Sequence, residues 1–212
     1  MRTTRRFFIL VAAALSWSFS AHGQSPLAQT ELINALRGGG YVIVFRHGAT
    51  PPDQADTDPL HLENIDKQRQ LNEAGRAQAR SIGEAMRKLK IPVGAVYTSM
   101  FNRAVETGKL LGLGEVKPTI DFAEGGLVVT AIENNRRAQA LRKLIATPPA
   151  SGTNIVVVTH KPNILDAFGK DWFEVKEGEA SIFKPDGAGG YQLIARLQAD
   201  DWNKLAQQAG SN

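Results

Sequence analysis

The stretch Val42–Gly48, with the sequence VIVFRHG, begins with four apolar residues and ends in an arginine, a histidine and a glycine. A second stretch, Ile155–His160 (IVVVTH), is another apolar run that leads to a histidine. Continuous apolar runs of this kind are typical of strands buried on both faces of a parallel sheet. Because ligands bind at the carboxyl edge of such sheets, we expect His47 and His160 to face one pocket, with Arg46 beside them.

Strand-like and helix-like segments alternate on both sides of these two stretches. Further strands are expected at residues 95–97, 118–120, 181–183 and 191–197, and helices at about 29–37, 73–90, 101–111, 136–145, from 162 to about 169, and from about 201 onward. The last two strands are separated by a Pro- and Gly-rich turn, which predicts an antiparallel hairpin. Residues 51–69 have no apolar period and contain several acidic residues, which predicts a surface loop. The fold class expected is α/β, a three-layer α/β/α sandwich with a mostly parallel central sheet and an antiparallel edge hairpin.

The amino-terminal 23 residues are expected to lie outside this domain. Three arginines at positions 2, 5 and 6 precede the apolar run 7–15, and small residues follow at Ala21 and Gly23. This pattern predicts a secretory signal peptide, residues 1–23, and a single mature domain, residues 24–212. The alternative, a membrane anchor, requires roughly 18 to 20 apolar residues, more than the run provides. We therefore expect a periplasmic or secreted protein without stable membrane insertion after cleavage.

Composition excludes several kinds of site. The chain has 212 residues and no cysteine, so it can form no disulfide, thiolate metal site or thiol nucleophile. Its net charge of +4 includes the three arginines of the expected signal peptide, and the mature chain would have 22 basic against 21 acidic residues. A charge this close to neutral does not indicate a nucleic-acid partner.

The grouping of histidine with arginine at a strand end indicates phosphoryl chemistry. An imidazole attacks phosphorus when one ring nitrogen is unprotonated and the other is held by a hydrogen bond. Arginine binds the phosphoryl oxygens with a planar fork of donors that remains charged at any working pH. Arg46 is one such donor, and Arg103, near the expected start of a helix capped by Ser99, is a second candidate. The alternative for Arg103 is a solvated position or a pair with Glu106.

Taken in order along the chain, these residues resemble a known family. The motifs are Arg46-His47-Gly48, Leu71-Asn72-Glu73-Ala74-Gly75-Arg76, Ser99, Arg103-Ala104, Thr107 and Thr159-His160. Together they resemble the histidine phosphatase superfamily, also called phosphoglycerate mutase-like, from about Gly39 to Trp202. The resemblance implies that His47 becomes phosphohistidine, that Arg46, Arg103 and His160 bind the phosphate, and that Thr50 lines the pocket. With two arginines stabilising charge, neither a metal nor another cofactor is expected.

The proton donor to the leaving group is less directly indicated. Lys161 follows His160, where the acid phosphatase and phytase branch has an acidic residue, so the chain resembles the smaller mutase-like branch. In that branch the donor is a carboxylate after the third strand, and Glu124, followed by two glycines, is our candidate. Asp121 and the acids of the 53–66 loop remain alternatives.

The function favoured by these patterns is hydrolysis of a small-molecule or glycan phosphomonoester through a phosphohistidine on His47. Two alternatives keep the same fold: a phosphomutase, and a non-catalytic phosphate-ligand-binding or scaffold protein. A metal-dependent hydrolase would need His47, His61 and Asp53 or Asp58, which lack a recognised ligand spacing. A dinucleotide-binding enzyme is disfavoured because no G-x-G-x-x-G follows the first strand.

Overall fold

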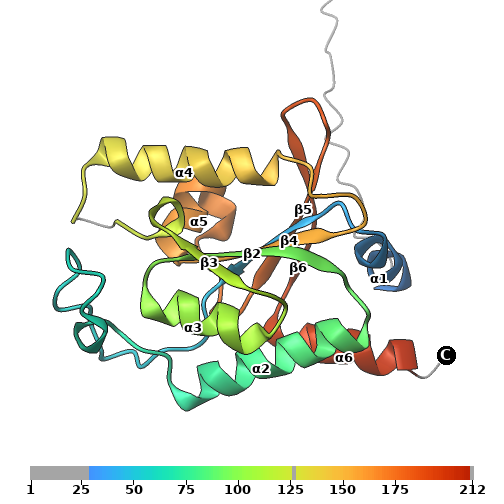
Figure 1. Cartoon of the computed structure of the whole chain (residues 1–212), viewed down its shortest axis with the longest axis horizontal. Helices are drawn as coiled ribbons and strands as arrows, with labels where there is room; N and C mark the ends of the chain where they lie inside the picture. Colours follow the sequence, from blue (N-terminus) through green and yellow to red (C-terminus); the bar gives the residue numbers. More distant parts are fainter. Residues whose placement is uncertain (1–28, 126–127, 211–212) are drawn as a thin grey trace, which may run out of the picture.

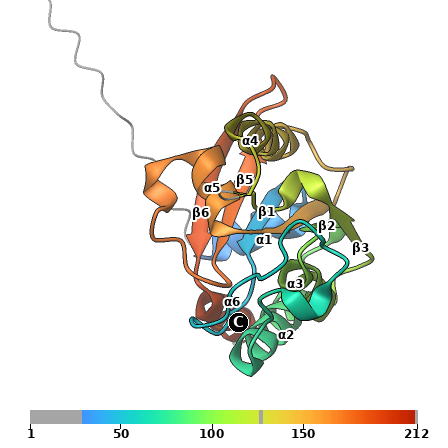
Figure 2. The same cartoon turned by 90° about the vertical axis from the view of Figure 1, so that its left-hand side faces the viewer.

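The computed structural model describes residues 29–125 and 128–210 and has three layers (Figures 1 and 2). One side of the sheet is covered by α1 (Gln29–Gly38), α2 (Glu73–Lys88), α3 (Asn102–Leu111) and α6 (Ala199–Gly210), and the other by α4 (Ala131–Ile145) and α5 (Lys161–Phe168). The expected signal peptide, residues 1–23, lies outside the described residues. No described helix is long and apolar enough to cross a membrane.

The central sheet has six strands in the order β3-β2-β4-β1-β5-β6. The strands are β1 (Val42–Arg46), β2 (Val93–Ser99), β3 (Val116–Thr119), β4 (Asn154–Thr159), β5 (Ala180–Pro185) and β6 (Tyr191–Leu197). The first four in this order are parallel, whereas β5 and β6 run antiparallel at one edge. The predicted fold class, including the edge hairpin, is therefore confirmed.

The pairing of β1 with β4 brings the two histidine stretches together. Arg46 lies opposite Thr159 in the parallel register, and the His47 amide donates to the Thr159 carbonyl at 3.0 Å. Both strands are buried on both faces, as their apolar runs predicted: Val42 and Val44 pack toward α4 and α5, whereas Ile43 and Phe45 pack toward the other layer.

The start of one helix and the cap of another differ from those expected. Helix α4 begins at Ala131 rather than Arg136, because the Thr130 side chain accepts a hydrogen bond from the amide of Glu133. The sequence Thr130–Glu133 is a capping-box pattern that could have revealed this start. The expected cap of α3 is also wrong, since the N-cap is Phe101 and not Ser99.

The segment between β1 and α2 contains only one short 3-10 helix, η1 (Ile65–Lys67), as expected for a loop. It lies at the left in Figure 1 and faces the viewer in Figure 2. Its first part is held against the start of α2 by two glycines. A Cβ on Gly48 would lie 2.8 Å from the Gly75 carbonyl oxygen, and one on Gly75 would lie 2.2 Å from that of Ala49. This close backbone approach explains why the residue after His47 is glycine.

Candidate active site

His47 follows β1 directly and is almost completely buried. Its Nδ1 atom lies 2.8 Å from the Gly48 carbonyl oxygen, so this nitrogen holds the proton of the neutral ring and donates it. The lone pair is then on Nε2, the arrangement needed for attack on phosphorus. Burial, followed by the positive charge of Arg103, lowers the pKa of His47 well below its ordinary value. The imidazole is therefore uncharged at neutral pH, with the Nε2 lone pair free of a proton.

His160 follows β4 and forms the N-cap of α5, next to His47. The two ring centroids are 5.2 Å apart. The His160 Nε2 atom lies 2.7 Å from the hydroxyl oxygen of Ser99, and its Nδ1 atom lies 3.5 Å from a carboxylate oxygen of Glu124. Burial and the charge of Arg103 lower the pKa of His160 as well. Ser99 thus orients His160, and its hydroxyl also accepts from the amide of Phe101, the N-cap residue of α3, at 3.1 Å.

Arg103 comes from the first turn of α3 and is completely buried. Its guanidinium donates to Asp56 at 2.9 Å and forms a short contact with Glu124, while its Cζ atom lies 4.5 Å from the centroid of the Phe101 ring. The alternative of a solvated arginine or a pair with Glu106 is wrong, because Glu106 accepts from Arg76 at 2.7 Å instead.

The position of Arg103 is reinforced by the motif threonine on the same helix. The Thr107 hydroxyl donates to the Arg103 carbonyl at 2.7 Å and accepts from the Gly48 amide at 3.0 Å. This one side chain therefore links the α3 turn that holds the arginine to the backbone that follows His47.

Arg46 and Thr50 both contact Glu177, which lies on the loop before β5. Arg46 donates to the Val175 carbonyl at 2.8 Å and lies 3.4 Å from Glu177 Oε1, which also accepts from the Thr50 hydroxyl at 2.7 Å. Thr50 is therefore near the arginine, as the resemblance implied, but its hydroxyl is bound to Glu177. Its contact with a substrate stays a prediction.

The Nε–H groups of three arginines are buried and make no hydrogen bond to any of the residues described. They belong to Arg46, Arg103 and Arg69, the last residue of the loop before the Leu71–Arg76 motif. The charge of Arg69 also lowers the pKa of both histidines, so it lies within electrostatic reach of them. Sequence reasoning missed Arg69 because the loop has no periodicity; its place two residues before Leu71 was the available signal.

The candidate carboxylates occupy very different positions. Glu124 and Asp56 both contact Arg103, so Glu124 and one acid of the 53–66 loop belong to the site. Asp121 instead pairs with Arg136 at 2.6 Å on the surface. His61 pairs with Asp58 at 2.7 Å and is 63% exposed, which separates it from the buried His47. Among the residues described, no group of three or more His, Asp or Glu is placed to hold a metal ion.

Comparison with known proteins agrees with this geometry. A family model described as "Histidine phosphatase superfamily (branch 1)" matches residues 42–127. The match supports the histidine phosphatase superfamily for this chain. It covers β1, α2, β2 and α3, the elements that place Arg46, His47 and Arg103.

Solved structures with this fold extend the likeness beyond residue 127. The protein histidine phosphatase SixA complexed with tungstate aligns with a TM-score of 0.53 at 17% identity, over 76% of this chain and 98% of that chain. YhfR of Bacillus stearothermophilus aligns with a TM-score of 0.53 at 16% identity, over 73% of this chain and 95% of that chain. A mycobacterial glucosyl-3-phosphoglycerate phosphatase in complex with inorganic phosphate aligns with a TM-score of 0.52 at 16% identity, over 76% of this chain and 99% of that chain. A search of curated proteins found no match. At these identities the structures establish a shared histidine phosphatase fold.

Proposed function

We propose that this protein is a phosphomonoesterase that forms a phosphohistidine on His47 Nε2. The observation that supports the proposal most strongly is the hydrogen bond from His47 Nδ1 to the Gly48 carbonyl, which leaves Nε2 with its lone pair. The buried guanidinium group of Arg103 and the partly exposed one of Arg46 supply positive charge for the phosphoryl oxygens.

The reaction proceeds in two displacements. His47 Nε2 attacks phosphorus, the bond from phosphorus to the ester oxygen breaks, and the departing oxygen takes a proton from Glu124. Water then attacks the phosphohistidine, loses a proton to the Glu124 carboxylate, and releases inorganic phosphate and neutral His47. Arg46, Arg103 and His160 bind the phosphoryl oxygens throughout, and this binding requires Arg103 to exchange part of its contact with Asp56 and Glu124 for the substrate.

Glu124 is favoured as the proton donor over Asp56 by its contacts. Its carboxylate lies 3.5 Å from His160 Nδ1 as well as against Arg103, so it is beside both phosphate-binding groups. The Asp56 carboxylate is occupied differently, because the same oxygen accepts from the Arg69 amide and from Arg103, both at 2.9 Å. Asp56 therefore positions the loop and Arg103.

Trapping of the intermediate tests catalysis against a binding or scaffold role. The signal-free protein is mixed with an aryl phosphate, quenched rapidly, and the peptide containing His47 is examined by mass spectrometry. We expect phosphorylation of His47 that disappears in His47→Ala together with turnover. His61→Ala, which removes an exposed histidine, is the matched control and should be labelled normally. Labelling without release of phosphate to water, but with transfer to a second alcohol, would favour a mutase.

The proposed location is the periplasm or the secreted fraction, and it rests on the Arg-rich start and short apolar run of residues 1–23. Mass spectrometry of the exported protein should find a chain that begins at or near Gln24. A full-length chain that stays with the membrane fraction would contradict the proposal.

A further inference from the structure

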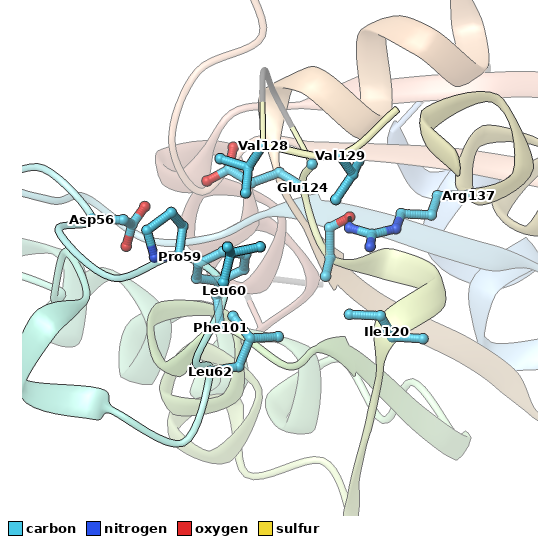
Figure 3. Close-up of a pocket in the computed structure, with 12 residues that line it drawn as sticks. Asp56, Pro59, Leu60, Leu62, Phe101, Ile120, Glu124, Val128, Val129 and Arg137 are labelled. Carbon is cyan, nitrogen blue, oxygen red and sulfur yellow. Dashed lines mark hydrogen bonds between the residues drawn. The ribbon is translucent and has the colours of Figure 1, made fainter. Parts of the chain in front are cut away.

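The part of the site that contains His47, His160, Arg46 and Arg103 is called the phosphate end. A cavity of about 330 Å³ lies beside it. Figure 3 shows Leu60 and Leu62, from the loop after β1, on one side of this cavity, and Ile120 and Val129, from the segment before α4, on the other. Apolar side chains therefore dominate its wall. Its volume is at the lower end of the range of small-molecule pockets, roughly 300 to 1,000 Å³.

The cavity begins where the ester oxygen of a bound substrate would lie. Glu124 lines it and also contacts Arg103 and His160. Phe101 lines it too, and the Phe101 ring meets the His160 ring edge-on, with centroids 5.3 Å apart. Two lining residues, Glu124 and Phe101, thus contact groups proposed to bind the phosphate, so the leaving group of a substrate bound there would lie beside the apolar wall.

Several apolar side chains of the wall are open to solvent. Leu60 is 71% exposed, and Ile120 and Val128 are each more than a third exposed. Covering exposed apolar surface with another apolar group removes it from water and lowers the free energy. Their position around a concave site, rather than scattered over the surface, indicates that the covering group is a ligand.

The described part of the lining has no free cation that could bind an anionic ligand body. Asp56 and Glu124 are acidic. Arg137 is the one cation among the described lining residues, and it is already paired. Its Nε donates to Glu133 at 2.9 Å and its Nη1 to the Ala123 carbonyl at 3.0 Å. No described lining group is therefore left with uncompensated positive charge for a substrate carboxylate.

We propose that this cavity binds the leaving group of the substrate and selects phosphate monoesters of uncharged, apolar alcohols, either aryl or alkyl. The proposal rests on the phosphomonoesterase function above and adds the substrate class. Covering Leu60, Ile120 and Val128 supplies the binding free energy, while the apolar wall and the absence of a free cation among the described lining residues disfavour a second negative charge on the substrate.

A series of alkyl phosphates tests this selection, because ethyl, butyl and hexyl phosphate have similar leaving groups and differ mainly in apolar length. We expect kcat/KM to rise about two- to fourfold per methylene, the upper value corresponding to full burial of each CH₂. The ester of 6-hydroxyhexanoate has the same length as hexyl phosphate but has a carboxylate, and we expect it to react at least about tenfold more slowly than hexyl phosphate.

Two variants assign the effect to the cavity. Leu60→Ser and Ile120→Ser should each reduce the ratio of hexyl to ethyl kcat/KM. Ile132→Ser is the matched control: it removes an apolar side chain that is 84% exposed on α4 and does not line the cavity, and it should leave the ratio unchanged.

The failures of the two proposals can be distinguished. Equal kcat/KM for ethyl phosphate, hexyl phosphate and the ester of 6-hydroxyhexanoate, with His47 still labelled, would overturn the cavity assignment and leave the proposed phosphatase function unaffected. A ratio that Leu60→Ser and Ile120→Ser leave unchanged would do the same. No turnover of any ester and no labelling of His47 would overturn the proposed function, and with it the assignment of the cavity.

Discussion

The two ends of the candidate site are built in different ways. The phosphate end takes His47, His160 and Arg103 from the carboxyl ends of β1 and β4 and from the first turn of α3, and all three are buried. The cavity end takes its apolar wall largely from two connecting segments, residues 56–62 and, in the second, residues 120–125 and 128–129. Strand pairing and the close approach of Gly48 to Gly75 fix the positions of residues at the phosphate end, whereas the cavity end depends on the conformation of loops. Chemistry and substrate choice are thus assigned to separable parts of the chain.

The largest effect that separates the two ends is expected from Arg103→Ala. Removing this buried guanidinium takes away stabilisation of the phosphoryl charge, so kcat/KM should fall by about 10³-fold. Because every substrate presents the same phosphoryl group, ethyl and hexyl phosphate should lose equally. Steady-state kinetics on both esters measures this, with circular dichroism to check folding. Arg136→Ala, at a surface ion pair, is the control. A loss confined to hexyl phosphate would show that Arg103 serves the cavity.

Glu124 lies at the border of the two ends, and Glu124→Gln should sharpen the distinction between them. The amide keeps the shape but cannot donate a proton of the required acidity, so kcat/KM for alkyl phosphates should fall by about 10²-fold, while kcat/KM for an activated aryl phosphate, which reports only the steps up to loss of the leaving group, changes little. A plot of rate against leaving-group pKa should therefore steepen.

Asp56→Asn is the comparison for Glu124→Gln, since both carboxylates contact Arg103. If Asp56 only positions Arg103, its variant should affect aryl and alkyl esters to the same degree. A steeper dependence on leaving-group pKa in Asp56→Asn, and not in Glu124→Gln, would reassign the proton donor to Asp56.

The residues on strands at the phosphate end could be predicted from the sequence, whereas those on loops around the cavity could not. The apolar runs before His47 and His160 predict buried parallel strands, and such strands meet at one edge, so Arg46 and both histidines could be placed together without a structure. Nothing in the aperiodic segment 51–69 indicates that Asp56 folds back onto Arg103 or that Leu60 lines a cavity. These positions depend on long-range contacts that no local pattern encodes.

Arg69 is a candidate site residue that the sequence analysis did not predict, and Arg69→Gln tests whether it belongs to the phosphate end. Its buried Nε–H and its charge are expected to contribute one charged hydrogen bond, about 1.5 to 3 kcal/mol, so kcat/KM should fall by about 10- to 100-fold for all esters alike. Inhibition by inorganic phosphate should weaken in parallel. Unchanged inhibition by phosphate would exclude Arg69 from the phosphate end.

The smallest expected effect is a change in the free energy of unfolding with pH. Its sign differs between the buried histidines and the exposed His61. The folded-state pKa values of His47 and His160 are lowered, mainly by burial, whereas the exposed His61 has its pKa raised by Asp58. Below pH 6.5 the unfolded chain takes up protons on His47 and His160 that the folded chain does not, so the protein loses stability as pH falls. The loss approaches about 1.4 kcal/mol per histidine between pH 7.5 and 5.5. Stability linked to His61 has the opposite sign, being present at low pH and lost as pH rises through its folded pKa.

Denaturant unfolding at the two pH values, in phosphate-free buffer because a bound dianion would favour protonated imidazole, measures this difference. His47→Gln and His160→Gln should each remove about 1.4 kcal/mol of the wild-type loss on acidification, because glutamine does not titrate. His61→Gln should instead leave the loss unchanged or increase it. If all three variants lose as much stability as the wild type, then the buried histidines take up protons in the folded state. His47 would in that case be protonated in mild acid and unable to attack phosphorus there, so the phosphate end would lose its nucleophile while the apolar cavity, which contains no histidine, kept its binding surface.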